Sequence, residues 1–471
     1  MAEPQAPVRH VSAIADDALG TSDAVDLIRR LRQREVSAPE LHRASRERIR
    51  AADAALNAVV VEIGDDPGTD HDGPFAGIPI ALKDNEDLRG YPTSWGSAAF
   101  GGRRAAGSSP IAAQLLSLGM RPLVKTTMPE FGLTATTEAL RFGPTRNPWD
   151  TDRSTGGSSG GSAALVAAGA VPLAHANDGG GSIRIPASCC GLVGLKPSRG
   201  RIVDLPDRER APVNLVTQGV VTRSVRDTAL FFAAAEQRYR NPALPPIGHV
   251  ERPVSRRLRV GLLATGYRGL EFSPVAAEAA QRAGALCESL GHRVEPVDHG
   301  YPETFGHDFL RYWALLAFGF KNLGRYAFGA NFDGRRTEPF TDGMAGLLRL
   351  EAERVPASLL RLRRFAHSEQ RLERRYDIVI APVLGHEPPL IGWLGAEVPF
   401  RTHLVRLLRY AMSTPVQNVI GAPAISLPIA RSPRGLPVGV QFSADVGRES
   451  LLLALALQLE EAAPWQVTPQ P

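Results

Sequence analysis

Apolar and polar positions follow two spacings along the chain, and each spacing predicts its own kind of element. Over 21–56 apolar residues recur at helical spacing in two segments, each opened by Ser or Thr, so we expect two helices there. The apolar run IPIAL then predicts a short buried strand that ends at Lys83. A helix is expected over 110–120 and a strand over 121–127.

The same alternation continues through the rest of the chain. It predicts strands over 171–176, 258–263 and 376–381, and helices over 162–169, 224–238 and 274–290. Strands that alternate with helices indicate an α/β fold, with a central mixed, largely parallel β-sheet and helices on both faces. The Pro-rich stretch 241–256 suits either a domain linker or a surface loop.

Composition narrows the class of protein. A hydrophobic fraction of 43% in 471 residues is enough for a large core. The net charge of +5 comes mostly from scattered Arg, which favours solubility more than any particular partner. Three cysteines cannot form a disulfide scaffold, and no segment has the apolar length of a signal peptide or a membrane span. We therefore expect a cytoplasmic protein that does not associate with membranes.

Two later segments each have two interpretations. Residues 301–332 hold ten of the chain's thirty aromatic residues, and they form either a helical pair packed on the core or the wall of a small-molecule pocket. Trp313 and Phe318 are the candidate substrate-binding residues there. Residues 335–375 hold ten Arg against six acidic residues, which indicates a solvated helix face more than a nucleic-acid surface. No nucleic-acid partner is expected.

Two glycine-rich turns carry the candidate chemistry. The segment GGSSG at 156–160 matches the nucleophile elbow of α/β-hydrolases, but the polar residues TRNPWDTDRST before it predict a loop and not the central strand that an elbow requires. The segment NDGGGSIRIPAS at 177–188 follows an apolar strand. Its glycines suit a turn whose successive N–H groups bind an oxyanion, although a plain glycine loop is an equal alternative.

A serine nucleophile needs a base, and the sequence offers two candidates. His175 lies within an apolar strand and is expected to be a core residue with its hydrogen bonds satisfied. Lys83 ends the strand IPIAL, and burial there would favour the neutral amine, because desolvation disfavours the charged form and lowers a lysine pKa. No metal-binding or phosphate-binding motif is present, so neither a metal nor a cofactor is expected.

Together these segments resemble the amidase signature family. The family's motifs stand here as LKDN (82–85), GGSSGG (156–161) and DGGGSIR (178–184), and the similarity extends over nearly the whole chain, least over 240–375. The resemblance implies a single amidase-signature domain over 1–471. Its core covers about 60–240 and 376–471, and 241–375 is a more variable region that forms a substrate pocket or cap.

The resemblance also implies roles for individual residues. Ser182 is the nucleophile, Ser158 follows a cis peptide bond and passes protons, and Lys83 is the terminal base. The oxyanion hole consists of the backbone N–H groups of Gly179, Gly180, Gly181 and Ser182. The implied reaction is hydrolysis of a small-molecule amide through an acyl-enzyme, which releases a carboxylate and ammonia or an amine.

The turn after Asp178 departs from the family at one position, since Gly179 stands where Thr is common. The DGGGSIR form resembles bacterial amidases similar to 6-aminohexanoate-cyclic-dimer hydrolase more than the glutaminase subunit of an amidotransferase. That subunit, which delivers ammonia to a partner chain, is one alternative, and a non-hydrolytic relative that binds or transfers an acyl group is another. Arg184 is expected to order the turn, and a homodimer is left open.

The aromatic segment bears on selectivity within this chemistry. If 301–332 lies over the Ser182 turn, we expect a preference for apolar or aromatic acyl groups over small polar ones such as that of glutamine.

Overall fold

The computed structural model describes residues 10–64, 72–102, 104–205, 211–266, 269–368 and 371–469. The first nine residues, whose polarity entered the prediction that there is no signal peptide, lie outside this range. Within it, no helix combines the length and the apolar character needed to cross a bilayer.

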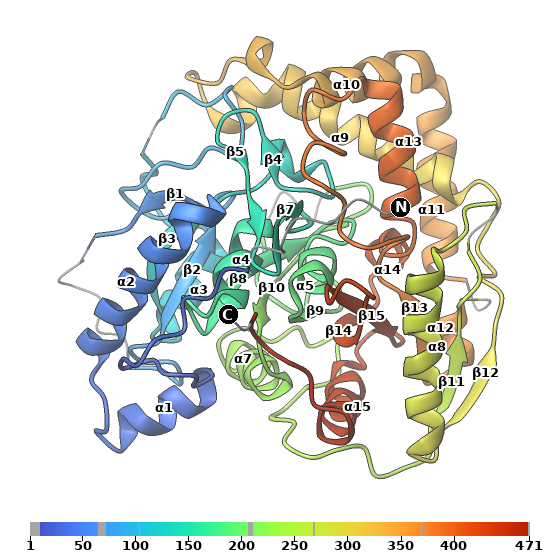
Figure 1. The fold of residues 1–471 in the computed structure, drawn as a ribbon. Helices are drawn as coiled ribbons and strands as arrows, with labels where there is room; N and C mark the ends of the chain where they lie inside the picture. The colour runs from blue at the N-terminus through green and yellow to red at the C-terminus, as the bar shows by residue number, and fades with distance from the viewer. Residues whose placement is uncertain are drawn as a thin grey trace, which may run out of the picture.

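One mixed sheet of 11 strands runs through the described residues (Figure 1). Its order is β1 (Val59–Glu62), β3 (Arg121–Thr126), β2 (Pro79–Lys83), β8 (Leu173–Asp178), β10 (Thr217–Thr222), β9 (Val193–Lys196), β14 (Ala424–Arg431), β15 (Pro437–Ser443), β13 (Ile378–Pro382), β11 (Arg259–Leu262) and β12 (Arg293–Pro296). Two short ribbons lie outside this sheet and pair β4 (Glu138–Ala139) with β5 (Gly143–Pro144) and β6 (Arg146–Asn147) with β7 (Asp150–Ser154).

The prediction of a mixed sheet is confirmed, but the prediction that it is largely parallel is wrong. Strands β3, β2 and β8 pair in parallel near one edge, and β13, β11 and β12 do so at the other. Every pairing from β8 through β10, β9, β14 and β15 to β13 is antiparallel, as is that of β1 with β3. Helix–strand alternation did not reveal that β10 inserts between β8 and β9, or that β14 and β15 form a hairpin.

Helices surround the sheet. The α-helices are α1 (Ala24–Arg32), α2 (Ala38–Leu56), α3 (Pro110–Ser117), α4 (Gly160–Ala167), α5 (Arg184–Cys190), α7 (Val225–Arg238), α8 (Pro274–Ser289), α9 (Phe305–Phe328), α10 (Pro339–Glu351), α11 (Val355–Ala366), α12 (Leu372–Arg375), α13 (Phe400–Tyr410), α14 (Pro415–Ile420) and α15 (Glu449–Ala462). Each helix and strand predicted from the apolar spacing is present, with ends that differ by a few residues.

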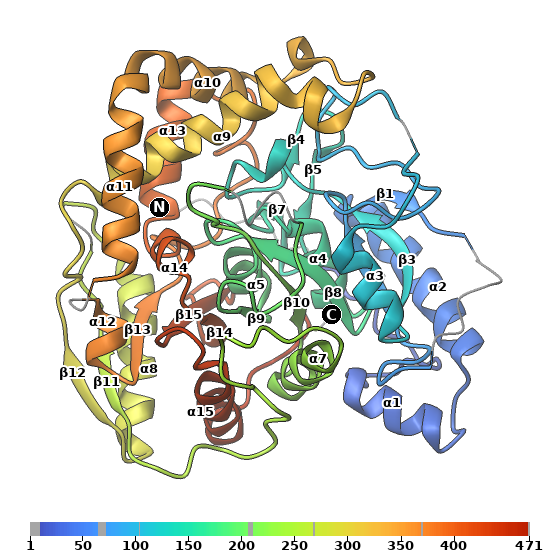
Figure 2. The ribbon, with the colours of Figure 1, turned by 180° about the vertical axis from the view of Figure 1, so that it is seen from behind.

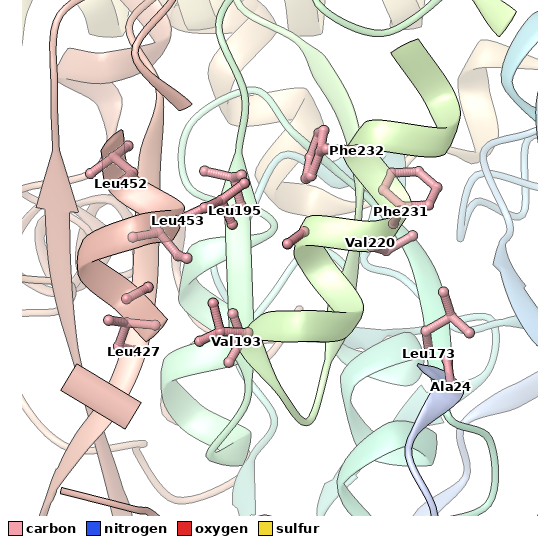
Figure 3. Packing of buried hydrophobic residues seen from close by; sticks show 14 of the residues in the cluster. Ala24, Leu173, Val193, Leu195, Val220, Phe231, Phe232, Leu427, Leu452 and Leu453 are labelled. Atoms are coloured by element: carbon pink, nitrogen blue, oxygen red, sulfur yellow. The ribbon is translucent and has the colours of Figure 1, made fainter. Parts of the chain in front are cut away.

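Helices lie on both faces because strand residues alternate between two cores. Ile80 and Leu82 belong to one apolar cluster and Ala81 to another, as the period of two requires. The first cluster contains α7 and α15, and Figure 3 shows Phe232 and Leu453 packed toward Leu195 of β9. The second cluster contains α4 and α5, so these two helices and the glycine-rich turns before them lie on the opposite face.

A helical layer covers the α4 and α5 face. Figures 1 and 2 place α9, α10 and α13 at one end of the molecule, with α7 and α15 at the other. Most of the aromatic segment 301–332 lies in one long helix, α9 (Phe305–Phe328), and not in the helical pair that is one interpretation of the sequence. Some arginines of the stretch 335–375 form ion pairs within this layer. Arg361 of α11 pairs with Asp308 of α9, and Arg354 pairs with Glu351.

The Pro-rich stretch 241–256 is a surface loop tied to the same core. It leads from α7 to β11, which belongs to the central sheet. The N–H of Ile247 donates to Glu236 of α7, and the N–H of Val254 donates to the carbonyl of Ala454 in α15.

Replacing Phe232 tests the packing between α7 and the sheet. The side chain is fully buried in the first cluster, so Phe232→Ala should cost about 3–5 kcal/mol of unfolding free energy. Leu323→Ala is the control, because Leu323 is 54% exposed and its loss should change stability by less than about 0.5 kcal/mol. Urea unfolding followed by circular dichroism measures both, and equal effects would contradict the packing described.

Candidate active site

Lys83 ends strand β2 and is completely buried. Its Nζ donates to Ser158 Oγ at 2.7 Å, to Ser159 Oγ at 2.9 Å and to Asn177 Oδ1 at 2.6 Å. These three acceptors are neutral oxygens from two other segments of the chain. The amine therefore joins the end of β2 to the GGSSG turn and to the end of β8.

Ser158 lies in the turn between β7 and α4, and the peptide bond Gly157–Ser158 is cis. A Cβ on Gly157 would lie 2.7 Å from the carbonyl oxygen of Thr136, so the close approach of two backbones requires glycine there. The sequence predicts a loop before the turn, and the structure instead has β7 there, which pairs with β6 and forms a single bridge from Arg153 to Leu390, outside the central sheet. The prediction that no central strand precedes Ser158 is confirmed.

Ser182 lies in the turn between β8 and α5. Gly181 adopts φ +133°, which favours glycine, and the hydroxyl of Thr414 donates to the carbonyl of Gly180 at 2.6 Å. Among the described residues, nothing accepts or donates a hydrogen bond to Ser182 Oγ. This hydroxyl faces a cavity and is available to a ligand.

The backbone donors of this turn differ from expectation at one position. The N–H of Gly181 donates to Asp178 Oδ1 at 2.7 Å, so it is already engaged. The N–H groups of Gly179, Gly180 and Ser182 donate to no acceptor within the described part of the chain. Three of the four expected oxyanion donors are thus available.

An ion pair between Asp178 and Arg184 supports the Ser182 turn. Both side chains are fully buried, and Arg184 Nε donates to Asp178 Oδ2 at 2.9 Å. Arg184 also donates to Asn418 and Gln441 at 2.7 Å each. Burial opposes ionisation of Asp178, but the adjacent Arg184 outweighs it and holds the carboxyl pKa well below its usual range. Arg184 therefore orders the turn, as its sequence context suggested.

His175 is a core residue, as predicted. It is fully buried on β8, and its Nε2 forms a hydrogen bond with Gln218 Oε1 at 3.0 Å.

Two cavities meet at Ser182. The Lys83 cavity is lined by Lys83, Ser158, Asn177, Gly179 and Ser182 together with aromatic side chains, and it holds about 1290 Å³ of empty space, open solvent included. The Ile185 cavity is lined by Gly157, Gly180, Ser182 and Ile185 together with apolar side chains of α9, α10 and α13, and it holds about 610 Å³ on the same measure. Ser182 is thus reachable from both sides.

Helix α9 brings one of its two candidate residues to the site. Trp313 lines both cavities, and its Nε1 donates to the carbonyl of Leu133 at 3.1 Å. Phe318 lines neither cavity and packs in the cluster of α9 and α10. Phe318 follows Trp313 by five residues, and at about 100° per residue it lies on roughly the opposite side of the helix. Both residues were candidates because they belong to the same aromatic segment, and that reason does not distinguish them.

Comparisons with known proteins agree with this geometry. A sequence model of the amidase family matches residues 40–453. The chain is 45% identical over 462 residues to "Putative amidase AmiC" of Mycobacterium tuberculosis, covering 97% of each. It is 35% identical over 485 residues to 6-aminohexanoate-cyclic-dimer hydrolase of Paenarthrobacter ureafaciens, covering 94% of this chain and 95% of the relative.

The solved structure of a 6-aminohexanoate cyclic dimer hydrolase with substrate superposes with a TM-score of 0.85 at 32% identity, covering 95% of this chain and 98% of that one. The chain belongs to the amidase signature family. It has the fold of the family and is an enzyme of the amide-hydrolase class.

Family membership does not account for Gly179, and the structure gives its local context. A Cβ at this position would lie 3.3 Å from Val216 Cγ2 and 3.8 Å from the ring of Trp313. The contact with Val216 is tight, whereas the contact with the Trp313 ring is an ordinary van der Waals contact.

Sequence reasoning missed several residues of the site. Ser159 and Asn177 contact Lys83 and lie inside or beside the motifs, so their positions could have identified them. Thr414 holds the Ser182 turn from 234 residues away, and Leu133 accepts the hydrogen bond of Trp313 from outside any motif. Only the folded chain reveals these two.

The Arg184→Met variant tests the support of the turn. It leaves the Asp178 carboxylate buried without its partner, so unfolding free energy at pH 7 should fall by about 3–5 kcal/mol. Arg29→Met is the matched control, because the pair of Arg29 with Asp26 is exposed and its loss should leave stability unchanged within error.

The sign of the pH dependence follows from the depressed pKa of Asp178. Its contribution to wild-type stability is complete above the unfolded carboxyl pKa of about 3.9 and is lost as the pH falls below that value. The stability difference between wild type and Arg184→Met should therefore narrow below about pH 4. Urea unfolding from pH 3 to pH 7 measures it, and a difference that widens on acidification would refute the ion pair.

Proposed function

We propose that the chain hydrolyses small-molecule amides through an acyl-enzyme, with Ser182 as nucleophile, Ser158 as the bridging acid and base, and Lys83 as the terminal base. One observation carries the proposal. The buried Lys83 Nζ lies 2.7 Å from Ser158 Oγ, and both residues line the same cavity as the unengaged hydroxyl of Ser182.

The reaction needs only these three side chains and the turn. A neutral Lys83 accepts the proton of Ser158, and Ser158 accepts the proton of Ser182 as Ser182 Oγ attacks the amide carbonyl. The N–H groups of Gly179, Gly180 and Ser182 stabilise the oxyanion that forms.

Collapse of the tetrahedral intermediate returns the proton. Ser158 protonates the leaving nitrogen and regains a proton from Lys83, so ammonia or an amine departs and Ser182 carries the acyl group. Water then attacks the acyl-enzyme by the same relay and releases the carboxylate.

The cavities favour this function over the glutaminase alternative. Glutamine carries an ammonium and a carboxylate, and burying either charge without a partner is costly. Among the described residues, no charged side chain lines the Ile185 cavity. The activities named for the relatives, an amidase and a hydrolase of a cyclic amide dimer, support a neutral amide substrate.

Replacing the three polar side chains tests the assignment. Ser182→Ala should abolish turnover of an amide, and Ser158→Ala and Lys83→Ala should each lower kcat by several orders of magnitude. The combined variant should be no worse than the worst single one, because the residues act as a unit. Ser117→Ala on α3 is the control and should retain full activity, and near-normal turnover by Lys83→Ala would overturn the proposal.

The pH profile tests the direction of proton transfer. Lys83 accepts a proton only when neutral, so kcat/KM should rise with pH as the lysine deprotonates and should level off at alkaline pH. Steady-state kinetics between pH 5 and pH 10 measure the profile. A profile flat from pH 5 to 9 would show that no titrating base takes part.

A further inference from the structure

The wall between the two cavities is built from few groups. Among the residues that the structure describes, only Gly132, Leu133, Ser182 and Trp313 line both cavities. The indole of Trp313 is fixed by its hydrogen bond to Leu133 and by stacking on Phe309, whose ring centroid lies 5.4 Å away. Trp313 therefore stands as a rigid partition beside the Ser182 turn.

The position of Ser158 distinguishes the two sides of the partition. Ser158 lines the Lys83 cavity, whereas its neighbour Gly157 lines the Ile185 cavity. In the proposed reaction Ser158 protonates the leaving nitrogen, so that nitrogen and its substituent must lie on the side of Ser158. The acyl chain, on the other side of the carbonyl carbon, then enters the Ile185 cavity.

The two cavities suit different groups. The Ile185 cavity is lined by the rings of Phe309 and Phe340 and by aliphatic side chains that include Leu404 and Leu407 of α13, and no charged group of the described chain lines it. The Lys83 cavity is lined by the rings of Trp95, Phe131, Phe320 and Phe328. Phe131 stacks on Phe320 with ring centroids 5.0 Å apart, so these rings present a continuous aromatic wall to the cavity.

Backbone conformation supports a functional role for the aromatic wall. Trp95 and Phe131 both have φ +52°, in the left-handed region that bulky side chains rarely adopt. The two residues are joined by a hydrogen bond from the N–H of Phe131 to the carbonyl of Trp95. Strained residues of this kind persist at binding sites where the surrounding structure enforces them.

We propose that Trp313 divides the site into an acyl chamber, the Ile185 cavity, and a leaving-group chamber, the Lys83 cavity, and that the substrates are secondary amides with an apolar acyl chain and an aromatic amine. The proposal rests on the proposed function, because the sides are assigned through Ser158. It extends that function by naming the substrate class and a specificity-determining residue. It also places Tyr312, Phe320 and Phe328 of α9 on the amine side, whereas the sequence-based expectation gave this segment to the acyl side.

A matched pair of variants tests the partition. Leu407→Ala opens only the acyl chamber and Leu316→Ala only the leaving-group chamber, and both side chains are half-buried. The substrates are the four amides formed from butanoic or octanoic acid with methylamine or aniline. The measured quantities are the octanoyl-to-butanoyl ratio and the anilide-to-methylamide ratio of kcat/KM, each relative to wild type, so that intrinsic reactivity cancels.

The expected result is a crossed pattern. Leu407→Ala should lower the octanoyl-to-butanoyl ratio about fivefold to tenfold and leave the anilide-to-methylamide ratio within about twofold. Leu316→Ala should lower the anilide-to-methylamide ratio about fivefold to tenfold and leave the octanoyl-to-butanoyl ratio within about twofold. Trp313→Leu should lower both ratios. The wild type should prefer octanoyl anilide among the four. A reversed pattern, a pattern in which both variants change both ratios, or a wild-type preference for methylamides would overturn the proposal.

A fluorophosphonate with an octyl chain separates failure of this proposal from failure of the proposed function. It should label Ser182 in the wild type and in each variant, as located by mass spectrometry of the labelled peptide, and this also shows that each variant is folded. Absence of labelling at Ser182 in the wild type would contradict the proposed function. Labelling at Ser182 together with uncrossed ratios would contradict the partition alone.

Discussion

The buried amine of Lys83 is the interaction on which the site depends. It draws the end of β2, the GGSSG turn and the end of β8 to one point, and its three hydrogen bonds fix the position of Ser158. The proposed reaction requires the neutral form of this amine, because only that form can accept a proton.

A second buried group shapes the other half of the site. The ion pair of Asp178 with Arg184 holds the backbone of the Ser182 turn, and Asp178 uses one carboxylate oxygen to engage the N–H of Gly181. The N–H groups of Gly179, Gly180 and Ser182, which have no acceptor in the described part of the chain, belong to the backbone that this pair holds. A donor that is already oriented needs no rearrangement when charge develops on the substrate, which is the main source of oxyanion stabilisation. In the proposed reaction Lys83 accepts the proton, and Asp178 fixes the backbone of the Ser182 turn.

Much of this could be predicted from the sequence because the signals are local. The apolar run that ends at Lys83 marks a buried strand, and the glycine-rich segments mark turns where backbones approach closely. The motifs then identify Ser158 and Ser182 through the family resemblance. The direction of the central strands could not be predicted, because β10 inserts between β8 and β9 by a pairing that no local pattern specifies.

The walls of the site lie beyond sequence reasoning for the same reason. Trp313 and Phe318 were equivalent as members of one aromatic segment, and only the face of α9 that meets Leu133 distinguishes them. Thr414 and Leu407 come from parts of the chain without a motif, and long-range packing places them at the Ser182 turn and in the cavity beside it. The candidate catalytic residues are therefore found in local motifs, whereas the residues that line the cavities are brought together by the fold.

Rapid-quench mass spectrometry of the wild-type enzyme during turnover of octanoyl anilide tests directly whether Ser182 forms the acyl-enzyme. The mass of the octanoyl group should appear on the peptide that contains Ser182 within the first turnover, together with one equivalent of released aniline. Aniline release without any acylated peptide, or an octanoyl group attached to Ser158, would contradict this role of Ser182.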